Sequence, residues 1–311
     1  MSAPLRTEQL SKVFRHVDAL RELTIEVPEG SVFALVGPNG AGKTTAMKTL
    51  LNIHEPTSGR AELLGVDSRS LGAEQFARIG YVSENQQMPE WMKVGYFLSY
   101  CREFYPEWRD EDAAELVRLF DLPLDRKLRH LSRGMRVKAA LASSLAYRPK
   151  LILLDEPFSG LDVLVREQLI ESVLDRTPEA TVFLSSHDLG EIESFASHIA
   201  YLHEGRLLFA EEMASLSDRF REIEVTLGEP TELPGDLPAT WLIPEQSGVV
   251  AGFVDSQFDS ERHRADIQRF FPGARSVTER VMPLRAIILA VSKAAQPAKR
   301  ARQRSEVNLC I

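Results

Sequence analysis

Short apolar runs alternate with stretches of helical periodicity through the first part of the chain. The runs lack polar alternation, which is typical of strands that are buried on both faces. They lie at 32–36, 79–83, 151–154 and 181–185. Apolar residues at helical spacing follow at 43–53 and 164–174, and residues 90–150 have a mostly helical pattern. Strands that alternate with helices predict an α/β fold with a parallel sheet covered on both faces.

Weaker patterns flank these runs. Residues 5–10 and 23–27 are expected to be short strands, and the second ends at a turn signal, Pro28-Glu29-Gly30. Within the helical stretch, Asp110 is the expected N-cap of a helix. The apolar stripe of this helix consists of Ala113, Leu116, Val117 and Phe120.

From about residue 220 the pattern changes, and alternating strands precede helical spacing around a segment rich in Pro and Gly. The expected strands are 222–227 and 248–255, and the expected helices are 259–271 and 283–293. We therefore expect a first domain over residues 1–219, a small α+β domain over 220–295 and a basic, flexible tail over 296–311.

Composition narrows the class of protein. The 311 residues include 37 Lys and Arg against 45 Asp and Glu, a formal net charge of −8. A hydrophobic content of 44% and a charged content of 26% are typical of globular proteins, so a disordered or coiled-coil chain is a poor description. Because the balance is acidic, nucleic acid is not expected as a partner.

No stretch suits secretion or a membrane span. The N-terminal sequence MSAPLRTEQL lacks the apolar segment of a secretory signal. The longest apolar run, Ala286 to Val291, is far shorter than the ~18 residues that a membrane helix needs. Cys101 and Cys310 form no metal or redox motif and indicate a reducing compartment. We expect a cytoplasmic protein.

A Gly-rich segment joins the first buried strand to the helix after it. Gly37-Pro38-Asn39-Gly40-Ala41-Gly42-Lys43-Thr44 fits G-x-x-x-x-G-K-[ST]. Such a loop points backbone N–H groups at phosphate, and the helix N-terminus adds positive potential. Lys43 would reach the β- and γ-phosphates and the Thr44 hydroxyl would hold magnesium. The segment predicts a nucleotide site.

Two acids, Asp155 and Glu156, end the buried strand at 151–154. A carboxylate at the C-terminal edge of a parallel strand points into the crevice where ligands bind. Asp155 suits a magnesium contact, and Glu156 suits a general base that polarises a water towards the γ-phosphate.

Three further motifs extend the pattern: Leu131-Ser132-Arg133-Gly134-Met135, Ser159-Gly160-Leu161-Asp162 and Ser185-Ser186-His187-Asp188. In order and spacing, the five motifs resemble the ATP-binding cassette (ABC) ATPase family over roughly residues 5–217. The chain is most similar to the cassette subunit of bacterial exporters whose membrane domains are a separate polypeptide. The resemblance implies a P-loop NTPase cassette, with a mixed sheet, helices and a helical subdomain at about 87–147.

The resemblance also implies roles for individual residues. The Walker A loop is matched by Gly37, Pro38, Asn39, Gly40, Ala41, Gly42, Lys43, Thr44 and Thr45. Asp155 and Glu156 match the Walker B aspartate and the catalytic glutamate. Ser132 and Gly134 match the signature motif, which contacts the γ-phosphate of ATP held by the opposite subunit.

Three other positions match the family. Asp162 matches the D-loop aspartate at the dimer contact, His187 matches the switch histidine that senses the γ-phosphate, and Phe14 matches the aromatic residue that stacks on adenine. Each position has a simpler interpretation. A lone histidine after a strand is usually a surface or core residue, Phe14 could be core packing, and Ser132 could be only a helix cap.

These matches imply an ATPase that uses ATP and Mg²⁺. Two ATP molecules would lie between two cassettes, in a homodimer or with a similar chain. Their hydrolysis would drive export through a multi-span membrane subunit in another chain, which would hold this chain on the inner face of the membrane. Residues 87–121 are rich in aromatic rings, which form either a partner surface or the core of the helical subdomain. The basic tail is either a solvated segment or a contact for anionic lipid.

The chain departs from the family at several positions. The signature motif usually has Gly where Arg133 stands and Gln where Met135 stands, and the aromatic position is more often Tyr than Phe14. The Q-loop glutamine is replaced by Glu84, which we expect to be able to ligate magnesium. Gln86 and Gln87 are close enough in sequence to substitute for it.

Two other functions compete with the exporter. The first is a non-transport ABC ATPase that acts on ribosomes or DNA, which the single cassette and the acidic balance disfavour. The second is a nucleotide-binding regulatory module with negligible turnover, in which Glu84, Arg133 and Met135 would be signs of decay. The intact residues Lys43, Asp155, Glu156 and His187 argue against the second.

Overall fold

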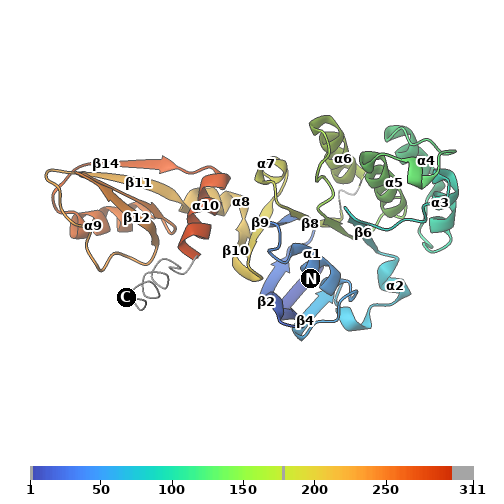
Figure 1. The fold of residues 1–311 in the computed structure, drawn as a ribbon, viewed down its shortest axis with the longest axis horizontal. Helices are drawn as coiled ribbons and strands as arrows, with labels where there is room; N and C mark the ends of the chain where they lie inside the picture. Colours follow the sequence, from blue (N-terminus) through green and yellow to red (C-terminus); the bar gives the residue numbers. More distant parts are fainter. Residues whose placement is uncertain (1–2, 177–178, 296–311) are drawn as a thin grey trace, which may run out of the picture. The chain divides into compact units, whose positions relative to one another are not determined.

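The computed structural model describes residues 3–176 and 179–295. The chain divides into two compact units, the first ending at Ala210 and the second beginning at Glu211 (Figure 1). This division precedes the boundary expected after residue 219, because helix α8 (Met213–Arg219) belongs to the second unit. The expected tail, 296–311, lies outside the described residues.

A six-stranded sheet with the order β10-β9-β3-β8-β7-β6 forms the centre of the first unit. Its strands are β3 (Val32–Val36), β6 (Ile79–Ser83), β7 (Leu151–Asp155), β8 (Thr181–Ser186), β9 (His198–His203) and β10 (Arg206–Glu212). The pairs from β6 through β9 are parallel. The four predicted buried runs are confirmed as β3, β6, β7 and β8. The outer strands β9 and β10 were not predicted.

A second, antiparallel sheet has the order β2-β1-β4-β5. Its strands are β1 (Leu5–Phe14), β2 (Val17–Val27), β4 (Ser58–Leu63) and β5 (Val66–Asp67). The first two are longer than predicted, because bulges interrupt their apolar alternation. Gln9 and Glu22 both have positive φ, at 46° and 53°, and the β1–β2 register shifts after Thr7.

The helices of the first unit are α1 (Lys43–Leu50), α2 (Ala73–Phe76), α3 (Val94–Arg102), α4 (Asp110–Leu119), α5 (Arg133–Leu145), α6 (Val163–Arg176) and α7 (Leu189–Ile192), with 3-10 turns at Ser68–Ser70 and Leu128–His130. Helix α5 packs against α3, α4 and α6. The expectation that Asp110 caps α4 is wrong. Arg109 is the N-cap, and Asp110 lies in the first turn, where its charge favours the positive end of the helix dipole.

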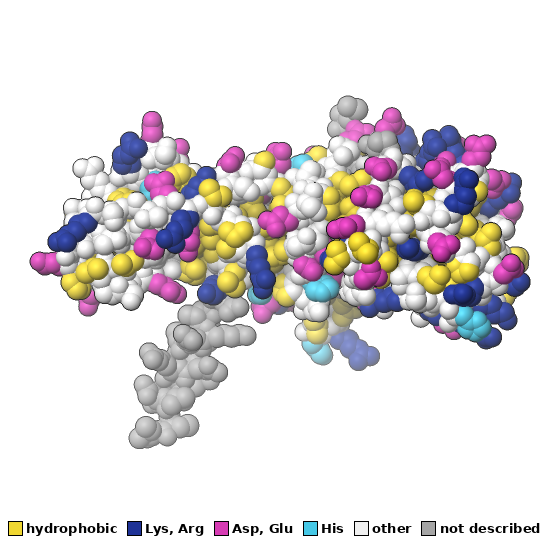
Figure 2. Space-filling model, turned by 90° about the horizontal axis from the view of Figure 1, so that it is seen from above, with side chains coloured by type: hydrophobic (Ala, Val, Ile, Leu, Met, Phe, Trp, Pro, Cys, Tyr) yellow, Lys and Arg dark blue, Asp and Glu magenta, His cyan; other side chains and the backbone are white. Residues whose placement is uncertain are grey.

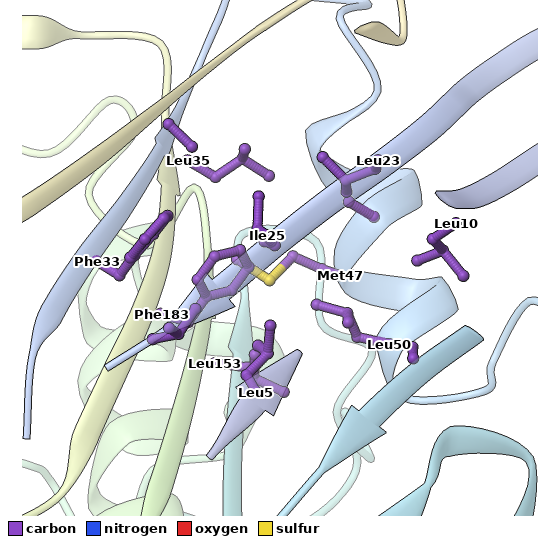
Figure 3. Packing of buried hydrophobic residues seen from close by; sticks show 14 of the residues in the cluster. Leu5, Leu10, Leu23, Ile25, Phe33, Leu35, Met47, Leu50, Leu153 and Phe183 are labelled. Atoms are coloured by element: carbon purple, nitrogen blue, oxygen red, sulfur yellow. The ribbon is translucent and has the colours of Figure 1, made fainter. Parts of the chain in front are cut away.

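Helix α1 lies between the two sheets, and its apolar face joins their cores. Met47 of α1 points towards Leu5 and Leu23 of the antiparallel sheet and towards Phe33 and Phe183 of the parallel sheet (Figure 3). All five side chains are buried, and each contributes about 1.5–3 kcal/mol by leaving water. This packing fixes the start of α1, where Lys43 lies, relative to the ends of β3 and β7.

The second unit contains an antiparallel sheet with the order β12-β13-β11-β14. Its elements are α8, β11 (Arg221–Leu227), β12 (Trp241–Ser247), β13 (Val250–Asp255), α9 (Ser260–Phe270), β14 (Ala274–Val281) and α10 (Leu284–Ala295). Trp241, Phe253 and Phe271 stack in its core. The prediction missed β12, which is bulged at Ile243, and β14, which is an exposed edge strand without apolar alternation.

Candidate nucleotide-binding site

The Gly-rich loop lies between β3 and α1, as the sequence predicts, and two of its glycines have no substitute. A Cβ at Gly37 would lie 2.2 Å from the backbone oxygen of Leu202, and one at Gly42 would lie 2.4 Å from that of Ala19. Gly42 also has a φ of 110° as the N-cap of α1. The loop is therefore pressed against neighbouring backbone at these two positions, where only glycine fits.

Lys43 is buried at the start of α1, with 5% of its surface exposed. Its ammonium Nζ donates hydrogen bonds to the carbonyl oxygens of Gly37 at 2.6 Å and Pro38 at 3.2 Å. It also lies 3.0 Å from Oε1 of Glu156. The cation thus joins the two ends of the Gly-rich loop to the end of β7.

Asp155 is the last residue of β7 and is also buried. Its Oδ1 accepts hydrogen bonds from the hydroxyls of Ser185 at 2.8 Å and Thr44 at 3.1 Å. Burial raises the pKa of the Asp155 carboxyl above its usual value, while these two hydrogen bonds act in the opposite direction. The site therefore holds a desolvated carboxylate beside the Thr44 hydroxyl.

Glu156 adopts a left-handed backbone conformation, with a φ of 51°. Such a conformation is costly for a residue other than Gly, and it is concentrated at functional sites. The Glu156 N–H donates to Oγ of Ser185 at 3.0 Å, and its Oε2 lies 2.7 Å from Nδ1 of His187. The turn after β7 thus directs one carboxylate oxygen to Lys43 and the other to His187.

Ser185 was named only as the first residue of the motif that contains His187, and no role was predicted for it. It sits opposite Asp155 in the β7–β8 ladder, and its hydroxyl contacts both Asp155 and the Glu156 backbone. The available signal was a serine at the end of an otherwise apolar buried strand. Its partners, however, depend on which strand lies beside β8.

The oxygens of Thr44 and Asp155 fit magnesium, which prefers hard oxygen ligands. Several of the ligands of a protein-bound magnesium ion are usually water and phosphate oxygens. Among residues 3–176 and 179–295, no cluster of three or more His, Cys, Asp or Glu side chains could hold a metal by itself. A metal here would therefore be held jointly by Thr44, Asp155 and a nucleotide.

The signature residues form a second group. Ser132 is the N-cap of α5, and its Oγ accepts from the Met135 N–H at 3.3 Å, so the capping interpretation holds. A Cβ on Gly134 would lie 3.4 Å from the Leu161 side chain. Asp162 accepts from the Val165 N–H at 3.0 Å in the first turn of α6. The starts of α5 and α6 are therefore neighbours.

Glu84 does not direct its carboxylate towards Thr44 and Asp155. Its side chain pairs with the Arg133 guanidinium, while its N–H donates to the Asp155 carbonyl at 2.9 Å. Gln86 accepts from the Ser83 N–H within its own turn. The structure thus gives the Glu84 side chain a different partner from the metal that the sequence suggested.

Phe14 ends β1 with 39% of its surface exposed. Its ring meets His54 edge-on, with centroids 5.1 Å apart, and lies 4.9 Å from Nζ of Lys12. Burial, followed by the charges of Lys48 and Lys12, lowers the pKa of His54. The ring is not core packing, and its exposed part is available to a planar ligand.

A Gly-rich loop between a parallel strand and a helix, a buried lysine in that loop and an aspartate at the end of an adjacent strand define a P-loop nucleoside triphosphatase. Comparison with known proteins narrows this class. The model of the ABC transporter family matches residues 20–159. The chain belongs to that family as an ATP-binding subunit, an ABC ATPase cassette.

Curated relatives of this chain include one protein named for import and others named for transport without a direction. An uncharacterized ABC transporter ATP-binding protein of Synechocystis sp. is 33% identical over 72% of this chain and 67% of its own length. The bacitracin transport ATP-binding protein BcrA of Enterococcus faecalis is 31% identical, over 71% and 73%. The Fe(3+) ions import ATP-binding protein FbpC of Pseudomonas fluorescens is 33% identical, over 75% and 69%.

Solved structures agree on the fold. The structure of an ATP-binding subunit of an ABC transporter superposes with a TM-score of 0.64 at 26% identity, covering 70% of this chain and 92% of that one. The α/β cassette fold predicted from the sequence is therefore confirmed for the first unit.

Proposed function

We propose that the chain is one of two cassettes that close around ATP and Mg²⁺ and drive export through a separate membrane subunit. The observation that carries this proposal is the convergence of Lys43, Thr44, Asp155, Glu156 and His187 at the ends of β3, β7 and β8. These groups supply phosphate binding, metal ligation and a base within one connected site.

Each residue has a distinct task in hydrolysis. Lys43 exchanges Glu156 for the β- and γ-phosphates when ATP enters the Gly-rich loop. Glu156, freed from that contact, accepts a proton from the attacking water, and His187 fixes the orientation of its carboxylate. Thr44 and Asp155 would hold magnesium, which would neutralise charge on the phosphates when bound. Phe14 stacks on the adenine ring.

A second cassette completes the site. Ser132 and Gly134 of one subunit would face the ATP of the other, with Asp162 at the contact. Exposed apolar side chains support an interface here, because Val163 and Leu164, next to Asp162, are 56% and 78% exposed. An apolar pair beside a polar loop is typical of a surface that a partner covers. A neighbour of known structure at 21% identity is itself a cassette dimer bound to ADP and Pi.

The membrane partner would dock on helix α3. Four aromatic residues are exposed on this helix and beside it: Tyr96 and Tyr100 within α3, Trp91 before it and Phe104 after it. Their rings pair as Trp91 with Tyr96 and Tyr100 with Phe104. The alternative that the aromatic rings are core holds for Phe97, which is buried. Tyr and Trp on a surface favour a protein interface.

Basic and acidic side chains are interspersed over the face of the molecule that Figure 2 shows. None of the described helices is long and apolar enough to cross a membrane. In this proposal the membrane subunit holds the chain on the cytoplasmic face of the membrane.

Affinity purification from gently solubilised membranes tests this proposal. The Glu156→Gln variant in ATP should recover a multi-span membrane protein whose co-expression stimulates the wild-type ATPase. Tyr96→Ala/Tyr100→Ala should lose that protein while still binding ATP. Accumulation of substrate inside inside-out vesicles would support export, and depletion would support the import direction named for FbpC. Recovery of ribosomes or nucleic acid without a membrane protein would overturn the transport function.

A further inference from the structure

Two residues that depart from the family pattern meet in this structure. Glu84 follows β6, and Arg133 is the first residue of α5. The Arg133 guanidinium donates a hydrogen bond to Oε1 of Glu84 across a cleft of about 800 Å³ between the loop after β6 and α5. The positive charge of Arg133 in the signature turn is therefore balanced by the negative charge of Glu84, which stands at the position of the Q-loop glutamine.

Arg133 also reaches the loop after β7. Gly160 has a φ of 68°, and a Cβ there would lie 2.9 Å from Nη1 of Arg133. The guanidinium thus rests on Gly160, where a larger residue would displace it. One side chain holds the starts of α5 and α6 together.

Glu84 connects this pair to the metal-binding end of the sheet. Its backbone N–H donates to the carbonyl oxygen of Asp155 at 2.9 Å, and Oδ1 of Asp155 accepts from Thr44. A continuous chain of contacts therefore runs from Thr44 through Asp155 and Glu84 to Arg133. It ends at Ser132 and Gly134, the turn that faces the partner's nucleotide in the proposed dimer.

We propose that Arg133 and Glu84 are a positioning pair that couples the two nucleotide sites of the dimer. A change at Asp155, at the end of β7 in one subunit, would shift the signature turn of that subunit. That turn faces the nucleotide bound by the other subunit. Neither residue touches a reacting atom. The coupling rests on the proposed dimer. The two departures from the family pattern, Glu84 and Arg133, belong together because their charges pair.

The pair predicts a specific pattern of kinetics. Arg133→Gln and Glu84→Gln should each lower the ATPase turnover about two- to fivefold, the size expected for a half-exposed ion pair. Each should also lower the Hill coefficient for ATP towards one. The double variant should be no worse than either single variant, and the charge swap Glu84→Arg/Arg133→Glu should recover part of the loss.

The neighbouring pair offers a matched control. Glu90 and Arg136 join the same loop to the same helix at 3.6 Å. Glu90→Gln and Arg136→Gln remove an equivalent charge, and turnover and the Hill coefficient should stay as in the unaltered protein. Equal losses in these controls would overturn the proposal, since any ion pair across the cleft would then suffice.

The ATP and magnesium dependence of turnover, measured for all variants together with their melting temperatures, decides the matter. Additive losses in the double variant would overturn the pairing. A change in magnesium requirement with Glu84→Gln but not with Arg133→Gln would make Glu84 a metal ligand instead. If sedimentation shows an ATP-dependent dimer but the variants keep full cooperativity, only the coupling fails. If there is no dimer, the proposed function fails with it.

Discussion

The Lys43 ammonium lies 3.0 Å from the Glu156 carboxylate, and both side chains are nearly buried. An ion pair removed from water is costly to break on one side, because the remaining charge is left without a partner. Binding of a phosphate offers Lys43 a replacement anion and releases Glu156 at the same moment. Glu156, the proposed base, thus stays paired with Lys43 until a nucleotide binds the lysine.

Glu156→Gln should separate binding from hydrolysis. The amide keeps the shape of the side chain but cannot accept the proton of the attacking water, so turnover should fall by about 10²- to 10⁴-fold. ATP affinity should be retained or increased, since Lys43 no longer faces a competing carboxylate. Steady-state ATPase and equilibrium binding of a fluorescent ATP analogue measure the two effects. Turnover within about tenfold of wild type would show that another group is the base.

Ser185→Ala should weaken hydrolysis, although the variant keeps every side chain that is proposed to contact phosphate. Its hydroxyl contacts both the Asp155 carboxylate and the Glu156 backbone N–H. Its loss leaves Asp155 with the Thr44 hydrogen bond and removes the acceptor of the Glu156 N–H, at a cost of about 1–3 kcal/mol. We expect a lower melting temperature and a turnover reduced about tenfold. Ser143→Ala is the control, because the Ser143 hydroxyl contacts the Ala140 carbonyl and Cys101, which are not residues of the candidate site. Equal kinetics for the two variants would contradict the role of Ser185.

Asp155→Asn should stabilise the nucleotide-free protein while inactivating it. Burial raises the pKa of Asp155 in the folded state. Above that pKa the carboxylate is ionised in both states, and its burial makes the folded state less stable. The melting temperature of the variant in EDTA should exceed that of wild type at pH 7. The difference should shrink as the pH falls through the folded pKa, and it should vanish below about 4, the usual aspartate value, where both states are protonated. A lower melting temperature at pH 7 would contradict this sign.

Asp255 in the second unit should have the opposite pH dependence. Its burial favours the neutral form, but three neighbours leave its pKa below the usual value: His263, whose Nδ1 lies 3.6 Å from Oδ2, the Gln257 N–H, which donates to Oδ1, and the charge of Arg262. A lowered pKa stabilises the fold above about pH 4, and that stability is lost as the pH falls through the folded value. Asp255→Asn should cost about 2 kcal/mol at pH 7 and flatten the acid limb.

Trp241 reports on this unit, because its ring stacks on Phe253 with centroids 4.0 Å apart. Urea unfolding should be followed by its fluorescence in a Trp91→Phe/Trp108→Phe background. An Asp255→Asn variant that unfolds at the wild-type urea concentration at pH 7 would contradict the account of Asp255.

The sequence predicted the parts of the fold whose pattern is local. Unbroken apolar runs identified β3, β6, β7 and β8, because a strand buried on both faces has no polar alternation to obscure it. The bulged strands β1 and β12 and the exposed strand β14 were shortened or missed, since bulges and edges break that pattern.

In the candidate site, too, the sequence predicted what depends on local motifs and missed what depends on the three-dimensional arrangement. Lys43, Thr44, Asp155, Glu156 and His187 were found because each belongs to a motif, and the structure brings them together. The role of Ser185, the left-handed conformation of Glu156 and the pairing of Glu84 with Arg133 depend on strand order and loop geometry. No local pattern specifies those.

Sedimentation of the Glu156→Gln variant tests the central claim, that two copies of this cassette close around ATP. With ATP and magnesium the protein should sediment as a dimer, and with ADP or with no nucleotide it should sediment as a monomer. Glu156→Gln/Lys43→Ala, which lacks the phosphate-binding lysine, should remain a monomer throughout. A Glu156→Gln protein that binds ATP yet stays a monomer at every concentration would contradict the account.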